Sequence, residues 1–436
     1  MTKFRQSRAD ERGAVLVHVA IAMLVLIAFS ALAIDYGALL VGRSQAQNAA
    51  DAAALAGASS LAFDDPDDIP RAKDSAAAAA QANLVLGAAP SIVAATDVQM
   101  VFPCPPGAPG LPDTCIRANV YRSAGRSNAL PTFFAQIVGV TSQDVRATAT
   151  AQVVTGNATD CLKPWAVADK WDENWENGAV NNGPWTPTSN FDKYMKQGND
   201  YVPDPSVTTP DIYTAPTPTS SGTGFAPFDS NGNPTSDYGL QISLKIGNSQ
   251  NRLSSGWFLS LDLPCPAGVG TGANCYRWNI KNCNDTVYKI GDSLTVSSEQ
   301  GNMVGPTDQG VEGGGPTNGD GLAILLRDPD ASWNSTTNTI QGSCAPGVCG
   351  DGLYHASSPR IVPVAVFNLD SFFASSPNGQ TSVTITNIMG FFIEGMGSGQ
   401  NRHDVIGRLV AVPGLTVGTS SVDETASFMR KVLLVR

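Results

Sequence analysis

Residues 13–34 read GAVLVHVAIAMLVLIAFSALAI and contain no Asp, Glu, Lys or Arg. As an α-helix these 22 residues would be roughly 33 Å long, close to the hydrocarbon thickness of a bilayer. Four cations precede the run, at Lys3, Arg5, Arg8 and Arg12. After the run, Arg43 is the nearest cation. Because positively charged flanks stay in the cytoplasm, the sequence predicts a single-pass membrane helix, with residues 1–12 cytoplasmic and the bulk of the chain outside.

A cleaved signal peptide is the alternative interpretation of this segment. Ala31-Leu32-Ala33 resembles an A-x-A cleavage site. However, the apolar core of a signal peptide is usually about 7–15 residues long, and this run is longer. The sequence therefore favours a retained anchor, which with its edge covers residues 13–41.

The helix is expected to continue beyond the membrane, because residues 36–62 (YGALLVGRSQAQNAADAAALAGASSLA) are rich in good helix formers. Small residues recur there every four positions and allow close helix packing. They form two stripes: Ala46, Ala50 and Ala54, continuing to Ala58, and Ala49, Ala53 and Gly57. Two interpretations stay open. Either the stripes pack on their own domain, or they pack on helices of partner subunits.

Three features in this order resemble a known family: Arg12-Gly13, the edge Ile34-Asp35-Tyr36, and the stretch QNAADAAALAGA over residues 47–58. Together they are similar to the N-terminal region of the Tad (tight adherence) pilus-assembly proteins of the TadE/TadG type. The resemblance covers residues 12–60. It implies a bacterial inner-membrane protein with an extracytoplasmic body that takes part in Flp-type pilus assembly and surface adherence. The implied partners are the membrane, other pilus-assembly proteins, or further copies of the chain that associate through the N-terminal helix.

One position departs from related pilin-like segments, which carry a Glu five residues after a Gly in the apolar run. Here Gly13 is followed at that position by His18. The resemblance therefore implies a retained accessory protein instead of a subunit that is processed and polymerised.

The composition argues against nucleic-acid binding. The net charge is −11, and there is no Lys/Arg run beyond the first dozen residues. Non-specific binding of nucleic acid needs a basic surface that displaces counterions. With 43 Gly, 29 Pro and only 15% charged residues, the chain is expected to be rich in strands and turns.

The cysteines are even in number and indicate disulfides in an oxidising compartment, because no Cys-x-x-Cys pair suggests zinc. The expected pairs are Cys104 with Cys115, Cys265 with Cys275, Cys344 with Cys349 and, by elimination, Cys161 with Cys283.

The predicted fold class is α+β. The membrane helix would extend into a small α+β unit over residues 42–156, with helices at 70–86 and 130–139 and strands at 97–102, 115–122 and 143–154. A β-rich body of sandwich or barrel type would follow at residues 157–436, with a Pro/Thr/Ser-rich excursion at 203–236. Its expected strands are 239–246, 256–263, 275–281, 322–327, 361–368, 381–386, 389–394 and 405–412.

Residues 229–237 carry the one candidate metal site. Asp229, Asn231, Asn233 and Asp237 have spacings found in calcium loops, but Pro234 and Leu240 stand where such a loop needs Gly and Glu. We expect a polar turn, with calcium as the alternative, and no other cofactor.

Catalysis is not expected. No Gly-x-Ser-x-Gly elbow occurs, and His403 with its neighbour Asp404 would point to opposite faces of a strand. A second hypothesis is a membrane-tethered binding module or adhesin that uses the Trp-rich β domain. Large aromatic residues are, however, more often part of a core.

Overall fold

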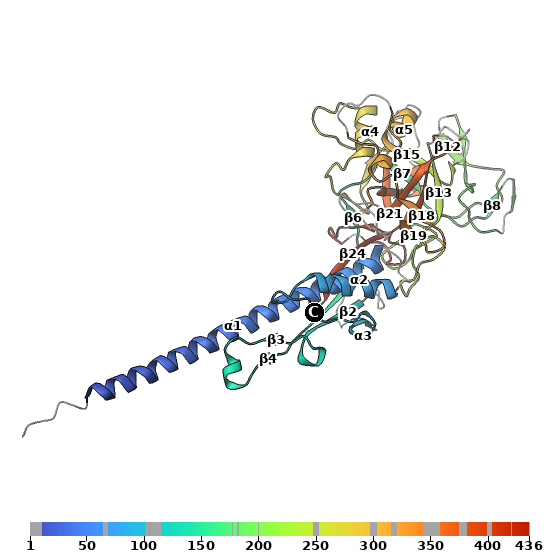
Figure 1. Cartoon of the computed structure of the whole chain (residues 1–436). Helices are drawn as coiled ribbons and strands as arrows, with labels where there is room; N and C mark the ends of the chain where they lie inside the picture. The colour runs from blue at the N-terminus through green and yellow to red at the C-terminus, as the bar shows by residue number, and fades with distance from the viewer. Residues whose placement is uncertain are drawn as a thin grey trace, which may run out of the picture.

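The computed structural model describes residues 11–63, 69–101, 104, 115–176, 178–180, 183–198, 200–246, 253–296, 303–314, 321–342, 358–374, 382–398, 403–419 and 421–435. Over these residues a long helix projects from a folded part of the molecule and carries its N-terminal half away from it (Figure 1). The helix α1 runs over Glu11–Phe63, 53 residues, which corresponds to roughly 80 Å.

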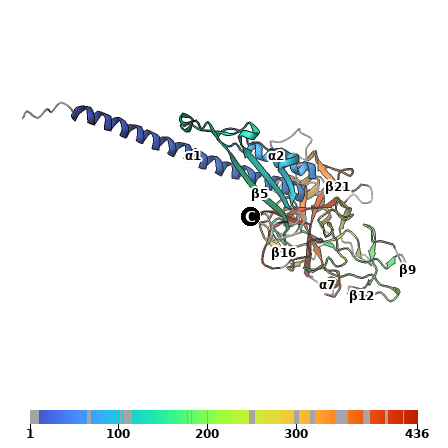
Figure 2. The same cartoon turned by 90° about the horizontal axis from the view of Figure 1, so that it is seen from below.

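The C-terminal half of α1 packs on a small α+β unit. The helix α2 (Ile69–Ala82) lies against it, and both cover a sheet in the order β1-β2-β5-β24-β23 (Figure 2). The strands of this sheet are β1 (Val98–Val101), β2 (Cys115–Arg122), β5 (Val145–Thr155), β23 (Val412–Pro413) and β24 (Met429–Val435). The short helix α3 (Ala94–Asp97) leads into β1.

The last strand of this sheet comes from the far end of the chain. The strand β24 pairs antiparallel with β5, with Lys431 opposite Val154 and Val435 opposite Thr150. The predicted range 157–436 had placed this segment in the C-terminal body. A local sequence pattern does not show which strand this segment joins.

Six strands close a barrel in the body, in the order β21-β20-β7-β15-β13-β22 with β22 pairing back to β21. Two neighbouring pairs are parallel, β20 with β7 and β13 with β15, and the others are antiparallel. The strands are β7 (Trp165–Ala168), β13 (Gln241–Ile246), β15 (Trp257–Ser260), β20 (Ile361–Phe367), β21 (Ser382–Met396) and β22 (Val405–Val410). The strand β17 (Ser293–Thr295) adds to the edge of β21.

Alternate residues of all six strands form one buried cluster, which includes Trp165, Phe258 and Phe391. Side chains alternate across a strand, so this cluster fills the barrel interior. The helices α4 (Ala273–Lys281) and α5 (Val304–Val311) add Tyr276 and Val311 to it. The predicted class is thus confirmed: a long apolar helix, mixed α and β structure, and a β-rich body of barrel type.

Several predicted elements differ from the structure. Residues 275–281 lie in α4 and 324–327 in α6 (Ile324–Arg327), although both were predicted as strands. In α4 the buried Cys275, Tyr276, Asn279 and Ile280 follow helical spacing, which a short window does not distinguish from alternation. The two strands predicted at 381–386 and 389–394 form the single long strand β21.

Residues 130–139 were predicted as one helix. They form instead the two-residue strand β3 (Leu130–Pro131) and the 3-10 helix η2 (Ala135–Val138). With β4 (Ser142–Gln143) they make a hairpin beside α1 (Figure 1).

Candidate functional site

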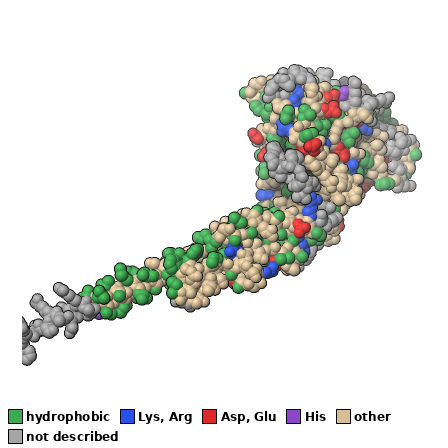
Figure 3. Space-filling view, in the orientation of Figure 1, with side chains coloured by type: hydrophobic (Ala, Val, Ile, Leu, Met, Phe, Trp, Pro, Cys, Tyr) green, Lys and Arg blue, Asp and Glu red, His purple; other side chains and the backbone are tan. Residues whose placement is uncertain are grey.

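The free half of α1 is apolar on every side. All the large apolar side chains between Val15 and Ile34 are exposed, from 46% at Val25 to 73% at Leu16. They form the green surface of the projecting helix (Figure 3). By length and composition this helix could cross a membrane. An N-terminal signal sequence shares both features, so apolarity alone does not distinguish an anchor from a leader.

Asp35 is the first buried side chain after the apolar run, with 7% exposure. Its carboxylate accepts hydrogen bonds from the backbone N–H groups of Phe133 (2.7 Å), Phe134 (3.0 Å) and Ala135 (2.5 Å). These N–H groups lie at the start of η2, where a short helix leaves its first donors unsatisfied. Asp35 therefore caps η2 from α1 and fixes the hairpin to the helix.

Gly42 makes the second contact between α1 and the hairpin. A Cβ placed there would lie 2.6 Å from Cδ1 of Leu130, which is itself 2% exposed. Seven residues separate Gly42 from Asp35, so the two contacts lie about 10 Å apart along one side of the helix. Neither the capping role of Asp35 nor the close contact at Gly42 was predicted from the sequence. The position of Asp35 at the end of an uncharged run is the sequence signal that could have indicated its role.

The small-residue stripes pack within their own unit. Ala49, Ala50, Ala53 and Ala54 are 0% exposed and Ala46 is 1% exposed, in a cluster with residues of α2, β2 and β5. A Cβ on Gly57 would lie 2.7 Å from Ile116 Cδ1 and 3.1 Å from the carbonyl oxygen of Ala72. The interpretation that these stripes meet partner helices is therefore wrong for the folded unit, because the sheet and α2 already cover them.

The polar residues of the same stretch lie at the edge of this packing. Gln47 donates from Nε2 to Asp51 Oδ1 (2.7 Å) and to the carbonyl oxygen of Thr148 (3.3 Å). Gln45 Oε1 accepts from the backbone N–H of Leu86 (2.7 Å). Gln47 and Asp51 line a cleft of about 560 Å³ between α1, β2, the middle of β5 and the end of β24.

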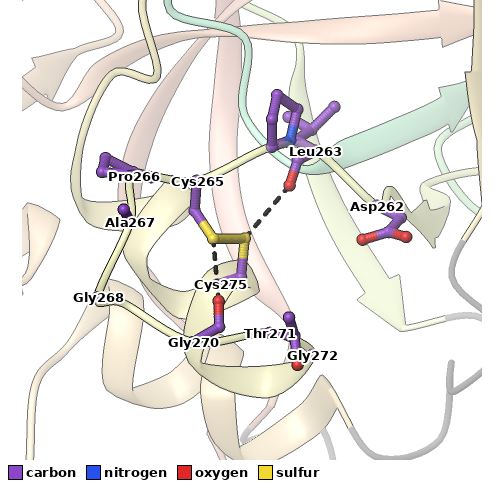
Figure 4. A pocket seen from close by; sticks show the side chains of 11 residues that line it. Asp262, Leu263, Cys265, Pro266, Ala267, Gly268, Gly270, Thr271, Gly272 and Cys275 are labelled. Carbon is purple, nitrogen blue, oxygen red and sulfur yellow. Dashed lines mark hydrogen bonds between the residues drawn. A yellow bond between two sulfur atoms is a disulfide. The ribbon is translucent and has the colours of Figure 1, made fainter.

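Three predicted cysteine pairs lie within the described residues, and the structure joins all three as disulfides. They are Cys104–Cys115, Cys161–Cys283 and Cys265–Cys275. Cys344 and Cys349 lie outside the described residues. The Cys265–Cys275 bridge closes a loop that lines a cavity of about 480 Å³ (Figure 4). Asp262 is the one titratable side chain among its lining residues, so the cavity has no acid–base pair.

The two carboxylates among the candidate calcium residues bind different partners. Asp229 accepts from the backbone N–H groups of Asn231 (2.8 Å) and Asn233 (2.9 Å), and from Asn233 Nδ2. Asp237 instead binds Lys170 Nζ at 2.9 Å. Both carboxylates thus have partners within the protein, and the hydrogen bonds of Asp229 lie within one turn. The surrounding 203–236 segment has irregular backbone but is packed, with Tyr213, Phe225 and Phe228 buried.

Two of the buried titratable groups in the body, Lys163 and Asp169, have pKa values shifted close to the neutral range. Burial lowers the pKa of Lys163 to about 7, with a further contribution from the positive charge of Arg327, although its Nζ donates to the carbonyl oxygen of Asn282 (2.9 Å). Burial raises the pKa of Asp169 to about 6, against hydrogen bonds from Phe225, Lys170 and Tyr213. Backbone and phenol groups surround these side chains, which is the environment of structural buried charges.

His403 Nδ1 lies 2.7 Å from Asp308 Oδ2. Asp308 belongs to α5. The pair is about one-third exposed on each side and forms a surface ion pair when the histidine is protonated. His355 lies outside the described residues.

The Trp residues contribute to the core and not to an exposed aromatic surface. Trp165, Trp171, Trp175 and Trp257 are 0–8% exposed. Trp171 and Trp185 meet edge to face, with ring centroids 6.0 Å apart.

The structure thus has the architecture of a folded body carried on a long, partly uncovered helix. One end of a long helix is apolar and uncovered, and the other end is the central element of a small α+β unit that carries a β-barrel body. Residues 13–60 match the family model described as "Putative Flp pilus-assembly TadE/G-like". The resemblance expected for the N-terminal region is therefore confirmed, and Asp35, Gly42 and Gly57 lie within the match. No curated protein and no solved structure was found to match the chain.

Proposed function

We propose that this chain is a membrane-anchored accessory protein of Flp-type pilus assembly, with its folded part outside the cytoplasm. The observation that supports it is α1 itself. One continuous helix holds both the uncovered apolar segment and the stretch similar to TadE/G-like proteins.

Retention of the anchor is favoured by the way α1 folds. Cleavage after Ala33 would leave Asp35 and Gly42 near a free chain end, although these residues hold the hairpin to the helix. Three disulfides among the described residues fit an oxidising compartment on the far side of the inner membrane. The role is structural and not catalytic, in keeping with a family of pilus-assembly proteins.

A strain that lacks the gene tests the proposal by electron microscopy of its surface pili and by surface adherence. The full chain should restore both. A chain in which a cleavable secretory leader replaces residues 1–34 should be exported in soluble form and should not restore them. Normal piliation in the deletion strain would overturn the pilus role, and restoration by the soluble form would overturn the need for an anchor.

The adhesin alternative is less favoured, because four of the seven Trp residues are buried in the body. The adhesin function would be favoured over pilus assembly if the purified chain bound to a glycan or matrix array and the deletion strain had normal pili.

A further inference from the structure

The tip of the β3–β4 hairpin presents an apolar surface that is exposed among the residues the structure describes. Four apolar side chains are exposed on it: Phe133 (55%), Phe134 (37%), Ile137 (80%) and Val140 (44%). No charged residue occurs between Arg126 and Asp144. The tip is also a defined structure and not a loose loop. The N–H of Val140 donates to the carbonyl of Ala135 (3.1 Å), and Gly139 ends η2 with a φ of +91°.

The position of this tip along α1 is fixed. Asp35 holds the start of η2, and it directly follows the run of exposed apolar side chains from Val15 to Ile34; Leu40 (46%) and Val41 (48%) are still exposed beyond it. The hairpin β3–β4 lies beside α1 (Figure 1). The apolar tip therefore continues the apolar surface of the segment that would lie in the membrane. Tyr36, 58% exposed, adds a third aromatic side chain at the same level.

From this geometry we propose that the hairpin tip inserts into the outer interfacial layer of the bilayer and acts as a second membrane contact beside α1. The inference rests on the proposed membrane anchor. Aromatic and aliphatic side chains without neighbouring charge favour this layer, where aromatic rings are enriched in membrane proteins. The Asp35 carboxylate can lie near this boundary because backbone N–H groups satisfy it. Two contacts would fix the tilt and rotation of α1, and with them the direction in which the body points.

Site-directed spin labelling of the full chain tests the proposal in vesicles of phosphatidylethanolamine and phosphatidylglycerol. A nitroxide is attached at Ile137→Cys, at Leu24→Cys in the apolar segment, and at Ile212→Cys in the body. Ile212 is the matched control, because it is apolar and 52% exposed but far from the helix in sequence. The wild-type chain treated with the same reagent gives the background from native cysteines. Collision with oxygen, which concentrates in lipid, is compared with collision with a water-soluble nickel chelate.

Labels at Leu24 and Ile137 should collide more with oxygen than with nickel, and the label at Ile212 should show the reverse. If Leu24 reports lipid while Ile137 resembles Ile212, the inference fails and the anchor stands. If the label at Leu24 also collides more with nickel than with oxygen, the proposed membrane anchor is wrong, and the inference about the hairpin tip is wrong as well.

The substitution Asp35→Ala tests the connection between helix and tip. It should raise nickel accessibility and mobility at Ile137 and leave the Leu24 label unchanged. An unchanged label at Ile137 would show that Asp35 does not hold the tip in the bilayer.

Discussion

The two folded regions of this molecule build their cores in opposite ways. The core of the α+β unit consists mostly of Ala, with backbones so close that Gly57 has no room for a Cβ. The barrel is filled by large side chains such as Trp165, Phe258 and Phe391. The α+β unit therefore depends on small side chains at its helix contacts, and larger side chains there should destabilise it. The barrel depends on large side chains in its interior, and truncating them should destabilise it.

The largest effect is expected from removing an aromatic ring in the barrel. Phe391 is 0% exposed, and Phe391→Ala should lower the free energy of unfolding by about 3–5 kcal/mol. All seven Trp residues lie between Trp165 and Trp333, so Trp fluorescence in a denaturant titration follows this region selectively. Ile212→Ala, at an exposed position, is the control. Equal midpoints for the two variants would show that the barrel is not filled as described.

A pH dependence should also be specific to the body. Burial raises the pKa of Asp169 from 3.8 to about 6, so the folded state holds this proton more tightly than the unfolded state. Its contribution to stability is therefore full below about pH 4 and is lost as the pH rises to 6, by about 3 kcal/mol at most. Asp169→Asn should flatten this part of the profile of unfolding free energy, measured by Trp fluorescence from pH 4 to 7.

Asp229→Asn provides a control of opposite sign. Partial desolvation of Asp229 is outweighed by hydrogen bonds from Asn233, Asn231 and Gly232, so its pKa is lowered. Its contribution is present above the unfolded pKa and is lost as the pH falls. If the Asp169→Asn variant showed the same slope of unfolding free energy against pH as the wild type, the slope would belong to another titratable group.

In the α+β unit the corresponding test is to enlarge a small residue instead of truncating a large one. Gly57→Val should destabilise the unit by about 1–3 kcal/mol, because the new atoms meet Ile116 and the backbone of Ala72. Gly37→Val is the matched control, since nothing lies within 4 Å of a Cβ at Gly37. The helical signal at 222 nm should show an earlier transition for Gly57→Val alone, with the Trp transition unchanged. An equal loss in both variants would trace the effect to helix propensity and not to close packing.

This contrast also explains how much could be predicted from sequence. The N-terminal helix was predictable because its apolar run and its four-residue spacing of small residues are local patterns. The contact between Asp35 and η2 was not, since it joins residues 98 to 100 positions apart. In the body the barrel class was predictable from strand spacing. Its closure through β21 and β22 and the transfer of β24 to the other sheet depend on pairings that alternation does not encode.

The smallest effect is expected at the exposed edge of the α+β unit. Gln47→Ala removes side-chain hydrogen bonds to Asp51 and Thr148 in a solvent-exposed setting, which should cost about 0.5 kcal/mol. Chemical unfolding followed at 222 nm measures the change, and pilus counts in a complemented deletion strain measure its consequence. If Gln47 serves only the fold, the counts should match wild type. Fewer pili at unchanged stability would instead show that a partner binds the cleft beside Gln47 and Asp51, and would shift the functional surface from the membrane edge to this side of α1.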